Sequence, residues 1–113
     1  TGGMGVVGPV AVDENLKEKI RRDIVEKSLS GLRARGFDYR GILFIGVMVT
    51  PSGPSVLEYN VRFGDPETQV VLPLLTGSWR ENLLAVARAD RPWPIWSWHP
   101  QRAVACVVLA AEG

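Results

Sequence analysis

Cysteine and histidine each occur only once in these 113 residues. Because a disulfide needs two thiols, Cys106 cannot form one within the chain, and a single cysteine fits a reducing compartment such as the cytoplasm. His99 has no partner residue spaced for catalysis or for metal binding, so we expect it to lie in a linker. The sequence therefore predicts a cytoplasmic protein that has neither a disulfide framework nor a histidine-based site.

Long apolar runs and an excess of charge of one sign are also missing. No stretch approaches the ~20 apolar residues that a membrane-spanning helix needs, so we expect no membrane partner. Lys and Arg number 13 against 12 for Asp and Glu, and the formal charge of +1 makes no case for nucleic acid as a partner. A composition of 46% hydrophobic and 22% charged residues is ordinary for a globular protein. At this length we expect one small folded unit.

Polar and apolar residues alternate along the stretch 57–63, as they do in a β-strand. Side chains two residues apart share a face of a strand, so Glu58, Asn60 and Arg62 are predicted to point the same way. Glu58 and Asn60 offer the hard oxygen ligands that Mg²⁺ prefers. Arg62 offers a planar, permanently charged fork for phosphate or carboxylate oxygens. These groups could hold a metal-bound polyphosphate, but a sheet edge with its polar side in water gives the same pattern.

A helix is predicted directly after this strand. Gly64 breaks the strand, Asp65 is a good N-cap, and Pro66 suits the first helical position. An apolar run follows at 69–75. The polar row thus ends at a helix N-terminus, which is a favourable place for anions. Asp65 and Glu67 also have a purely structural interpretation, because acidic residues in a first turn complement the helix dipole.

The rest of the pattern predicts an α+β fold in which helices flank an antiparallel hairpin. Asp13 can cap a helix that runs to about Arg35 and stops at Gly36, because its apolar residues recur at steps of three and four. Residues 40–50 form an almost purely apolar run, typical of a strand that is covered on both faces. A turn at 51–54 joins this strand to the one that carries the polar row.

Further elements are predicted after this hairpin. Helices are expected at about 66–75 and 78–89, the second with Ser78 as its cap, and a strand is expected at 103–111. The length of the hairpin loop allows Gly46 to lie opposite Glu58. Because glycine has no side chain, the space beside Glu58, the proposed metal ligand, would then be empty.

The segment Thr1–Gly5 is rich in glycine. Glycine lets backbone N–H groups approach a ligand closely, which suits substrate binding. An ordinary flexible turn has the same composition, and the residues alone leave both interpretations open.

Three segments resemble one known family. Residues 58–69, with the sequence EYNVRFGDPETQ, closely resemble the signature of the glycinamide ribonucleotide synthetases (phosphoribosylamine–glycine ligases), which are ATP-grasp enzymes of purine synthesis. Thr1–Gly5 and Tyr39–Met48 match two other segments of this family. The resemblance covers nearly the whole chain. One departure lies at Val6–Pro9, where the family usually has Ala-Tyr-Ser-Pro, so that this chain lacks two hydroxyls.

The resemblance implies a domain organisation. Residues 1–90 would be a portion of the ATP-grasp catalytic lobe, 91–102 a connector rich in proline and tryptophan, and 103–113 the first strand of the family's C-terminal domain. We expect the chain to be an internal fragment of a longer enzyme. Its missing lobes would carry the strands and lysines that grip ATP, so the fragment is expected to have no turnover alone.

The resemblance also implies an activity, the ATP-dependent joining of glycine to 5-phosphoribosylamine through a glycyl phosphate. Glu58 and Asn60 would hold Mg²⁺ (or Mn²⁺), and Arg62 would be catalytic. Candidates for substrate contacts are Thr1, Gly2, Gly3, Asp65 and Glu67. Alternatives are another ATP-grasp carboxylate–amine ligase of purine synthesis, or a non-catalytic ATP-grasp remnant that acts as an interaction module.

Overall fold

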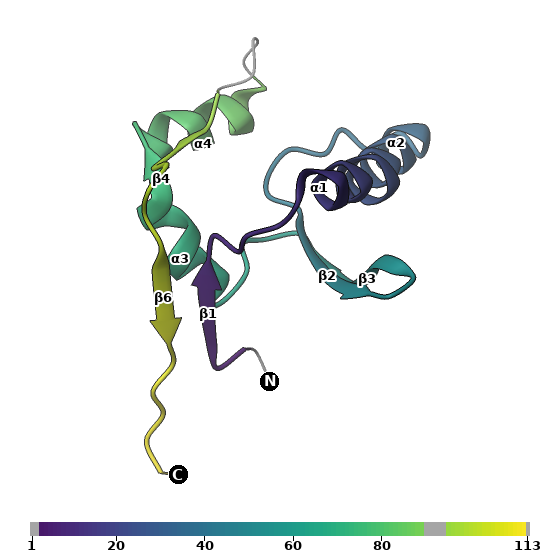
Figure 1. Ribbon diagram of the computed structural model, residues 1–113. Helices are drawn as coiled ribbons and strands as arrows, with labels where there is room; N and C mark the ends of the chain where they lie inside the picture. The colour runs from purple at the N-terminus through teal and green to yellow at the C-terminus, as the bar shows by residue number, and fades with distance from the viewer. Residues whose placement is uncertain (1–2, 90–94, 113) are drawn as a thin grey trace. The chain divides into compact units, whose positions relative to one another are not determined.

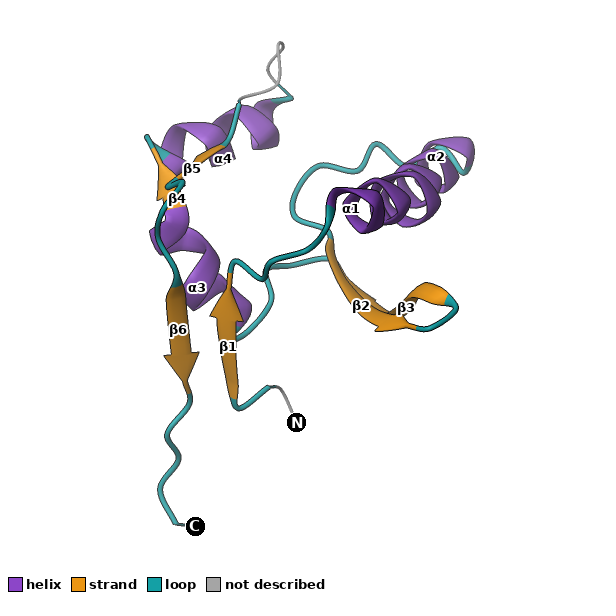
Figure 2. Cartoon of the chain, in the orientation of Figure 1, coloured by secondary structure: helices purple, strands orange, loops and turns teal. Residues whose placement is uncertain are grey.

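The computed structural model describes residues 3–89 and 95–112. The chain forms two compact units instead of the single one expected from its length. Ala11–Val61 makes one unit, and Thr1–Val10 together with Arg62–Gly113 makes the other. Helices and small antiparallel sheets occur in this chain (Figures 1 and 2), which confirms the predicted α+β class. Among the described residues, no helix is long and apolar enough to cross a bilayer.

The Ala11–Val61 unit begins with a nearly continuous helical rod. It consists of α1 (Glu14–Ile20), the π-helical segment η1 (Arg21–Glu26) and α2 (Lys27–Ala34). The predicted boundaries are confirmed, because Asp13 Oδ1 accepts a hydrogen bond of 2.9 Å from the Leu16 backbone N–H and the helix stops just before Gly36, whose φ is 78°. The apolar periodicity did not predict η1, since a π turn changes the hydrogen-bond spacing without removing the apolar stripe.

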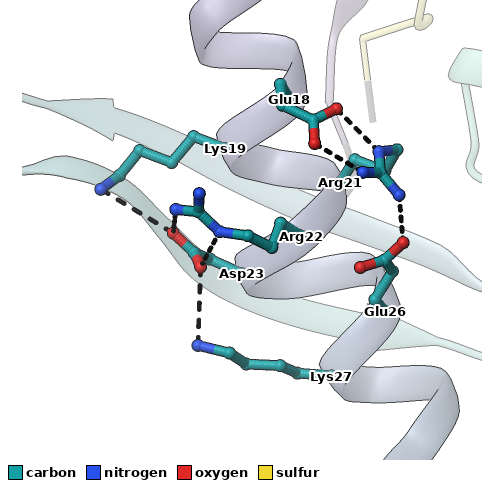
Figure 3. A network of polar contacts seen from close by, with 7 residues as sticks. All are labelled: Glu18, Lys19, Arg21, Arg22, Asp23, Glu26 and Lys27. Atoms are coloured by element: carbon teal, nitrogen blue, oxygen red, sulfur yellow. Dashed lines mark hydrogen bonds and ion pairs between the residues drawn. The ribbon is translucent and has the colours of Figure 1, made fainter.

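The solvent-facing side of this rod carries paired charges (Figure 3). Asp23 lies within 3.8 Å of Lys19, 3.0 Å of Arg22 and 3.6 Å of Lys27, and a hydrogen bond from Arg22 is the main reason why the pKa of Asp23 is lowered. Arg21 likewise bridges two glutamates. The seven residues drawn are Glu18, Lys19, Arg21, Arg22, Asp23, Glu26 and Lys27. Acidic and basic side chains thus alternate along the rod and pair with one another.

The hairpin of the same unit joins β2 (Phe44–Thr50) to β3 (Gly53–Asn60) in antiparallel register. Gly53 has a φ of 116°, a conformation that residues with a side chain rarely adopt, and it opens β3 directly after the turn. A β-bulge lies where the register shifts between Gly46 and Val47. The predicted hairpin is confirmed.

Two expectations about β2 were wrong. The strand begins at Phe44 instead of Arg40, because the chain before it turns at Gly41, whose φ is 140°. The strand was also expected to be covered on both faces, yet none of its residues is buried, and Met48 is 50% exposed. The helical rod packs on the hairpin from one side, and the other side of the two strands is open.

The other unit is organised around α3 (Glu67–Leu74), which contacts both strands of a second sheet. In that sheet β1 (Gly5–Gly8) pairs antiparallel with β6 (Val104–Val107), and Figure 1 shows the two strands side by side. Val70 of α3 is only 2% exposed. A Cβ placed on Gly8 would lie 2.9 Å from Val70 Cγ1, so glycine is what permits this close approach.

After α3 the chain forms β4 (Leu75–Thr76) and α4 (Trp79–Arg88), and β5 (Ser97–Trp98) returns to pair with β4. Ser78 Oγ caps α4 by accepting from the Glu81 N–H, as predicted, at 3.3 Å. The first part of the predicted connector, 91–94, lies outside the described residues, and its remainder includes β5. The strand predicted at 103–111 is shorter than expected, because only the residues of β6 find partners in β1.

Candidate functional site

Glu58 and Asn60 lie on the same face of β3. The ladder is regular here, with Gly46 opposite Glu58 and Phe44 opposite Asn60. Because side chains alternate along a regular strand, the two point to one side. The Glu58 side chain is exposed and Asn60 is half-buried, so neither is packed into hydrocarbon. The predicted pairing of Gly46 with Glu58 is confirmed.

Tyr59 marks the opposite face of β3, and it is bonded to the helical rod. Ser28 Oγ donates its hydrogen to the Ile24 carbonyl at 2.6 Å. Since that hydrogen is used, the Tyr59 hydroxyl must be the donor in its 2.8 Å contact with Ser28 Oγ. The chain of two hydrogen bonds ties β3 to α2 on the Tyr59 side. The rod therefore leaves the side of Glu58 and Asn60 open.

Sequence reasoning did not assign a role to Ser28 or Tyr59. A signal was present for Ser28, which follows the buried Ile24 by four residues and so lies on the apolar face of the helix, where a lone hydroxyl needs a partner. Nothing in the sequence indicated that the partner would be Tyr59, because the two residues are 31 positions apart.

Arg62 does not continue the strand, which ends at Asn60. Its Nη1 donates a 2.7 Å hydrogen bond to the Phe63 carbonyl, in a bend of the chain. The expectation that the polar row runs to Arg62 along one strand was therefore wrong, because strand pairing stops at Phe44–Asn60 and the chain turns. Arg62 belongs to the second unit, and its role beside Glu58 and Asn60 stays a prediction.

The glycine-rich loop lies against the start of α3. A Cβ on Gly3 would be 3.4 Å from Cδ of Pro66, a residue whose side chain is fully buried. Asp65 and Glu67 flank Pro66, so three of the predicted substrate-binding positions come together in this unit. The other two, Thr1 and Gly2, lie outside the described residues.

The start of α3 differs from the prediction in one respect. Pro66, not Asp65, is the N-cap residue, and the helix begins at Glu67. The Thr68 N–H donates to the Gly64 carbonyl at 3.1 Å, so a backbone oxygen accepts the hydrogen bond that an N-cap side chain would otherwise accept. The Asp65 carboxylate instead accepts a 2.8 Å hydrogen bond from the Gln69 amide and is exposed.

Comparison with known proteins identifies the family. The family model described as "Phosphoribosylglycinamide synthetase, ATP-grasp (A) domain" matches residues 1–68. The chain belongs to this family. The matched residues of this phosphoribosylglycinamide synthetase segment include every predicted site residue: Thr1, Gly2, Gly3, Glu58, Asn60, Arg62, Asp65 and Glu67.

Individual relatives of this synthetase segment are similar over its full length. It is 43% identical to a trifunctional purine biosynthetic protein adenosine-3 from Gallus gallus, of which it covers 11%. It is also 43% identical to a phosphoribosylamine–glycine ligase from Phenylobacterium zucineum, of which it covers 27%. A crystal structure of phosphoribosylamine–glycine ligase from Thermotoga maritima matches the whole chain with a TM-score of 0.82 at 39% identity, and the chain covers 28% of it. The segment thus spans about a quarter of the length of the ligases it matches.

The oxygen donors on β3 fit the kind of metal that an ATP-grasp domain implies. Mg²⁺ is usually held by one or two carboxylates, with water and substrate phosphates as its other ligands. Glu58 and Asn60 supply a carboxylate and an amide oxygen on one open face. Over residues 3–89 and 95–112, no group of three or more His, Cys, Asp or Glu side chains could hold a metal ion. A carboxylate and an amide oxygen alone fit a metal that takes its remaining ligands from water and substrate phosphates.

Proposed function

We propose that this chain is a segment of a cytoplasmic phosphoribosylamine–glycine ligase, which joins glycine to 5-phosphoribosylamine at the expense of ATP. The observation that carries the proposal is the placement of Glu58 and Asn60 on the face of β3 that the helical rod leaves open. The family match across these residues supports it. The longer ligase that contains this segment is called the full-length protein.

Glu58 and Asn60 would hold Mg²⁺ (or Mn²⁺), which when bound neutralises charge on the terminal phosphates of ATP. Arg62 carries a permanent charge that can stabilise the oxygens of the transferring phosphoryl group. Catalysis of this kind consists mostly of positioning and of electrostatic stabilisation. The task of this segment is therefore to present fixed oxygen ligands and one fixed cation to the nucleotide.

The reaction proceeds in two displacements. A carboxylate oxygen of glycine attacks the terminal phosphorus of ATP, ADP leaves, and glycyl phosphate forms. The amine of 5-phosphoribosylamine then attacks the acyl carbon, phosphate leaves, and the nitrogen loses a proton to give glycinamide ribonucleotide. Backbone N–H groups near Gly3 would bind anionic oxygens, and the carboxylates of Asp65 and Glu67 would bind the amino group of glycine or the amine of the second substrate. Thr1 and Gly2 are further candidates for these contacts.

The main partner of this segment would be the rest of the ligase. The hairpin unit has a single buried large apolar residue among those described, Ile24, while Leu57 and Met48 are 64% and 50% exposed. A two-stranded hairpin is at best marginally stable in water, and surfaces of this kind are normally covered. Residues that grip the nucleotide base would also come from outside the segment. We therefore expect no turnover from these 113 residues alone.

Replacing Glu58 in the full-length protein tests the proposal. Glu58→Ala should lower turnover by at least ~10²-fold, which is the scale of losing one electrostatic stabiliser of a charged transition state. A matched control is Glu14→Ala, because Glu14 is an exposed glutamate whose described contact is a surface pair with Lys17 at 2.6 Å. The control should keep its turnover. Near-normal turnover of Glu58→Ala at limiting Mg²⁺ would refute the metal-ligand assignment.

The substrates can be tested separately. The full-length protein should consume ATP when supplied with glycine and 5-phosphoribosylamine, and far less when another carboxylate replaces glycine. A preference for a different carboxylate would indicate another carboxylate–amine ligase. Calorimetry that detects no binding of MgATP to the full-length protein would indicate a non-catalytic interaction module.

A further inference from the structure

We propose that Gly46 is a positioning residue for Glu58, an inference that rests on the proposed role of Glu58 as a metal ligand. The two residues are directly paired across the hairpin. A Cβ added to Gly46 would lie 3.0 Å from Glu58 Cγ. Carbon atoms in favourable contact are about 3.5–4.0 Å apart, so an alanine here would press on the Glu58 side chain. The Glu58 side chain therefore occupies space that exists because residue 46 is a glycine.

The need for glycine arises from this space and not from the backbone. The φ angles of Gly36, Gly41, Gly53 and Gly77 are positive, but Gly46 is not among these positive-φ residues. Its backbone conformation is one that residues with a side chain adopt readily. An alanine at 46 would thus keep the strand geometry, and its effect would fall on Glu58.

A β-bulge lies directly beside this pair. Here the register shifts immediately after Gly46, so that Val47 pairs with Val56 and Leu57 is the extra residue. A bulge bends the strand locally and redirects the neighbouring side chains. The bulge lies next to Glu58, and Gly46 accepts the side chain from across the hairpin.

The effect should be specific to one ligand. Asn60, the second proposed ligand, pairs with Phe44, which already carries a full side chain. The Glu58 side chain is exposed, so Cγ can rotate away from an alanine at 46 without breaking the fold. Such a rotation changes the position of the carboxylate relative to Asn60 on the face that the two residues share. Gly46→Ala is therefore expected to weaken metal binding more than it destabilises the protein.

The experiment measures Mn²⁺ binding by electron paramagnetic resonance in the full-length protein, with ATP present and glycine omitted. Gly46→Ala should weaken Mn²⁺ binding by about tenfold, the effect of a moderate overpacking penalty falling on one ligand. Glu58→Ala should weaken it at least as much. The matched control is Gly31→Ala, because a Cβ at Gly31 would have only ordinary contact, with Arg35 Nη1 at 3.9 Å. This control should bind Mn²⁺ like the wild type.

The outcomes separate the two proposals. If Glu58→Ala weakens Mn²⁺ binding and Gly46→Ala does not, the positioning role of Gly46 is wrong and the ligand assignment stands. If neither variant changes Mn²⁺ binding, both proposals fail.

A double variant guards against general damage to the fold. Gly46→Ala should lower the thermal midpoint of the full-length protein slightly, and this change should disappear when Glu58 is also replaced by alanine, because the opposing Cγ is then gone. An equal loss of thermal stability from Gly46→Ala with and without the Glu58 side chain would overturn the inference.

Discussion

The contact between Gly8 and Val70 allows a quantitative test of how β1 packs on α3. Gly8 is the last residue of β1, and Val70 of α3 is 2% exposed. In Gly8→Ala the new Cβ would lie 2.9 Å from Val70 Cγ1. Val70 cannot easily turn its methyl group away, because a β-branched side chain in a helix has one strongly preferred rotamer. The substitution should therefore strain the sheet–helix contact.

The size of the effect follows from known costs of overpacking and of truncation. Inserting a methyl group into a tightly packed site costs about 1–3 kcal/mol. Val70→Ala removes two carbons from a buried position, which costs about 1.6 kcal/mol in transfer free energy, with a cavity term in addition. In the double variant the alanine at 8 enters the space that the Val70 methyl groups leave. We expect the double variant to be more stable, by about 1–3 kcal/mol, than the sum of the single effects predicts.

Amide hydrogen exchange of α3 in the full-length protein provides the assay. Local opening is governed by the free energy of the contacts that hold an element in place, and a loss of about 2 kcal/mol speeds exchange by roughly 30-fold. Gly31→Ala, in the other unit, should leave exchange in α3 unchanged. Unchanged exchange in Gly8→Ala would show that β1 does not press on Val70, and additive effects in the double variant would refute the proposed contact.

Two further predictions concern the helical rod. Tyr59→Phe removes the donor to Ser28 and should destabilise the hairpin unit by about 1 kcal/mol, measured as faster amide exchange in β3, whereas unchanged exchange would argue against this hydrogen bond. Pairing with Arg22 and Arg21 lowers the pKa of Asp23 and of Glu18 below their ordinary values of 3.8 and 4.5. The stabilisation that each ion pair gives to the rod is therefore fully present above the ordinary pKa of its carboxyl group. It is lost as the pH falls through the lowered pKa of that group in the folded protein. Protection of the rod should fall below pH ~4, and Asp23→Asn should flatten the profile; a profile that Asp23→Asn leaves unchanged would refute the pairing.

Much of the local structure could be predicted from the sequence. The cap at Asp13, the stop at Gly36 and the cap at Ser78 were predicted correctly, because each depends on residues within one helical turn. The hairpin also followed from the turn at 51–54, whereas the β-bulge between Gly46 and Val47, which local patterns did not predict, sets the exact pairing of Gly46 with Glu58. The candidate metal ligands could also be found from local pattern alone, because two side chains two residues apart on a regular strand share a face whatever surrounds them.

Tertiary structure decided the remainder. The pairing of β1 with β6 joins residues about a hundred positions apart, and no local pattern specifies such a partner. The hydrogen bond between Ser28 and Tyr59 likewise depends on how the helix and the strand meet, and it determines which face of β3 stays open. The sequence predicted which side chains stand together on one element, because that depends on backbone periodicity. Which face is covered and where strand pairing ends depend on contacts between distant segments, and these exist only in the folded chain.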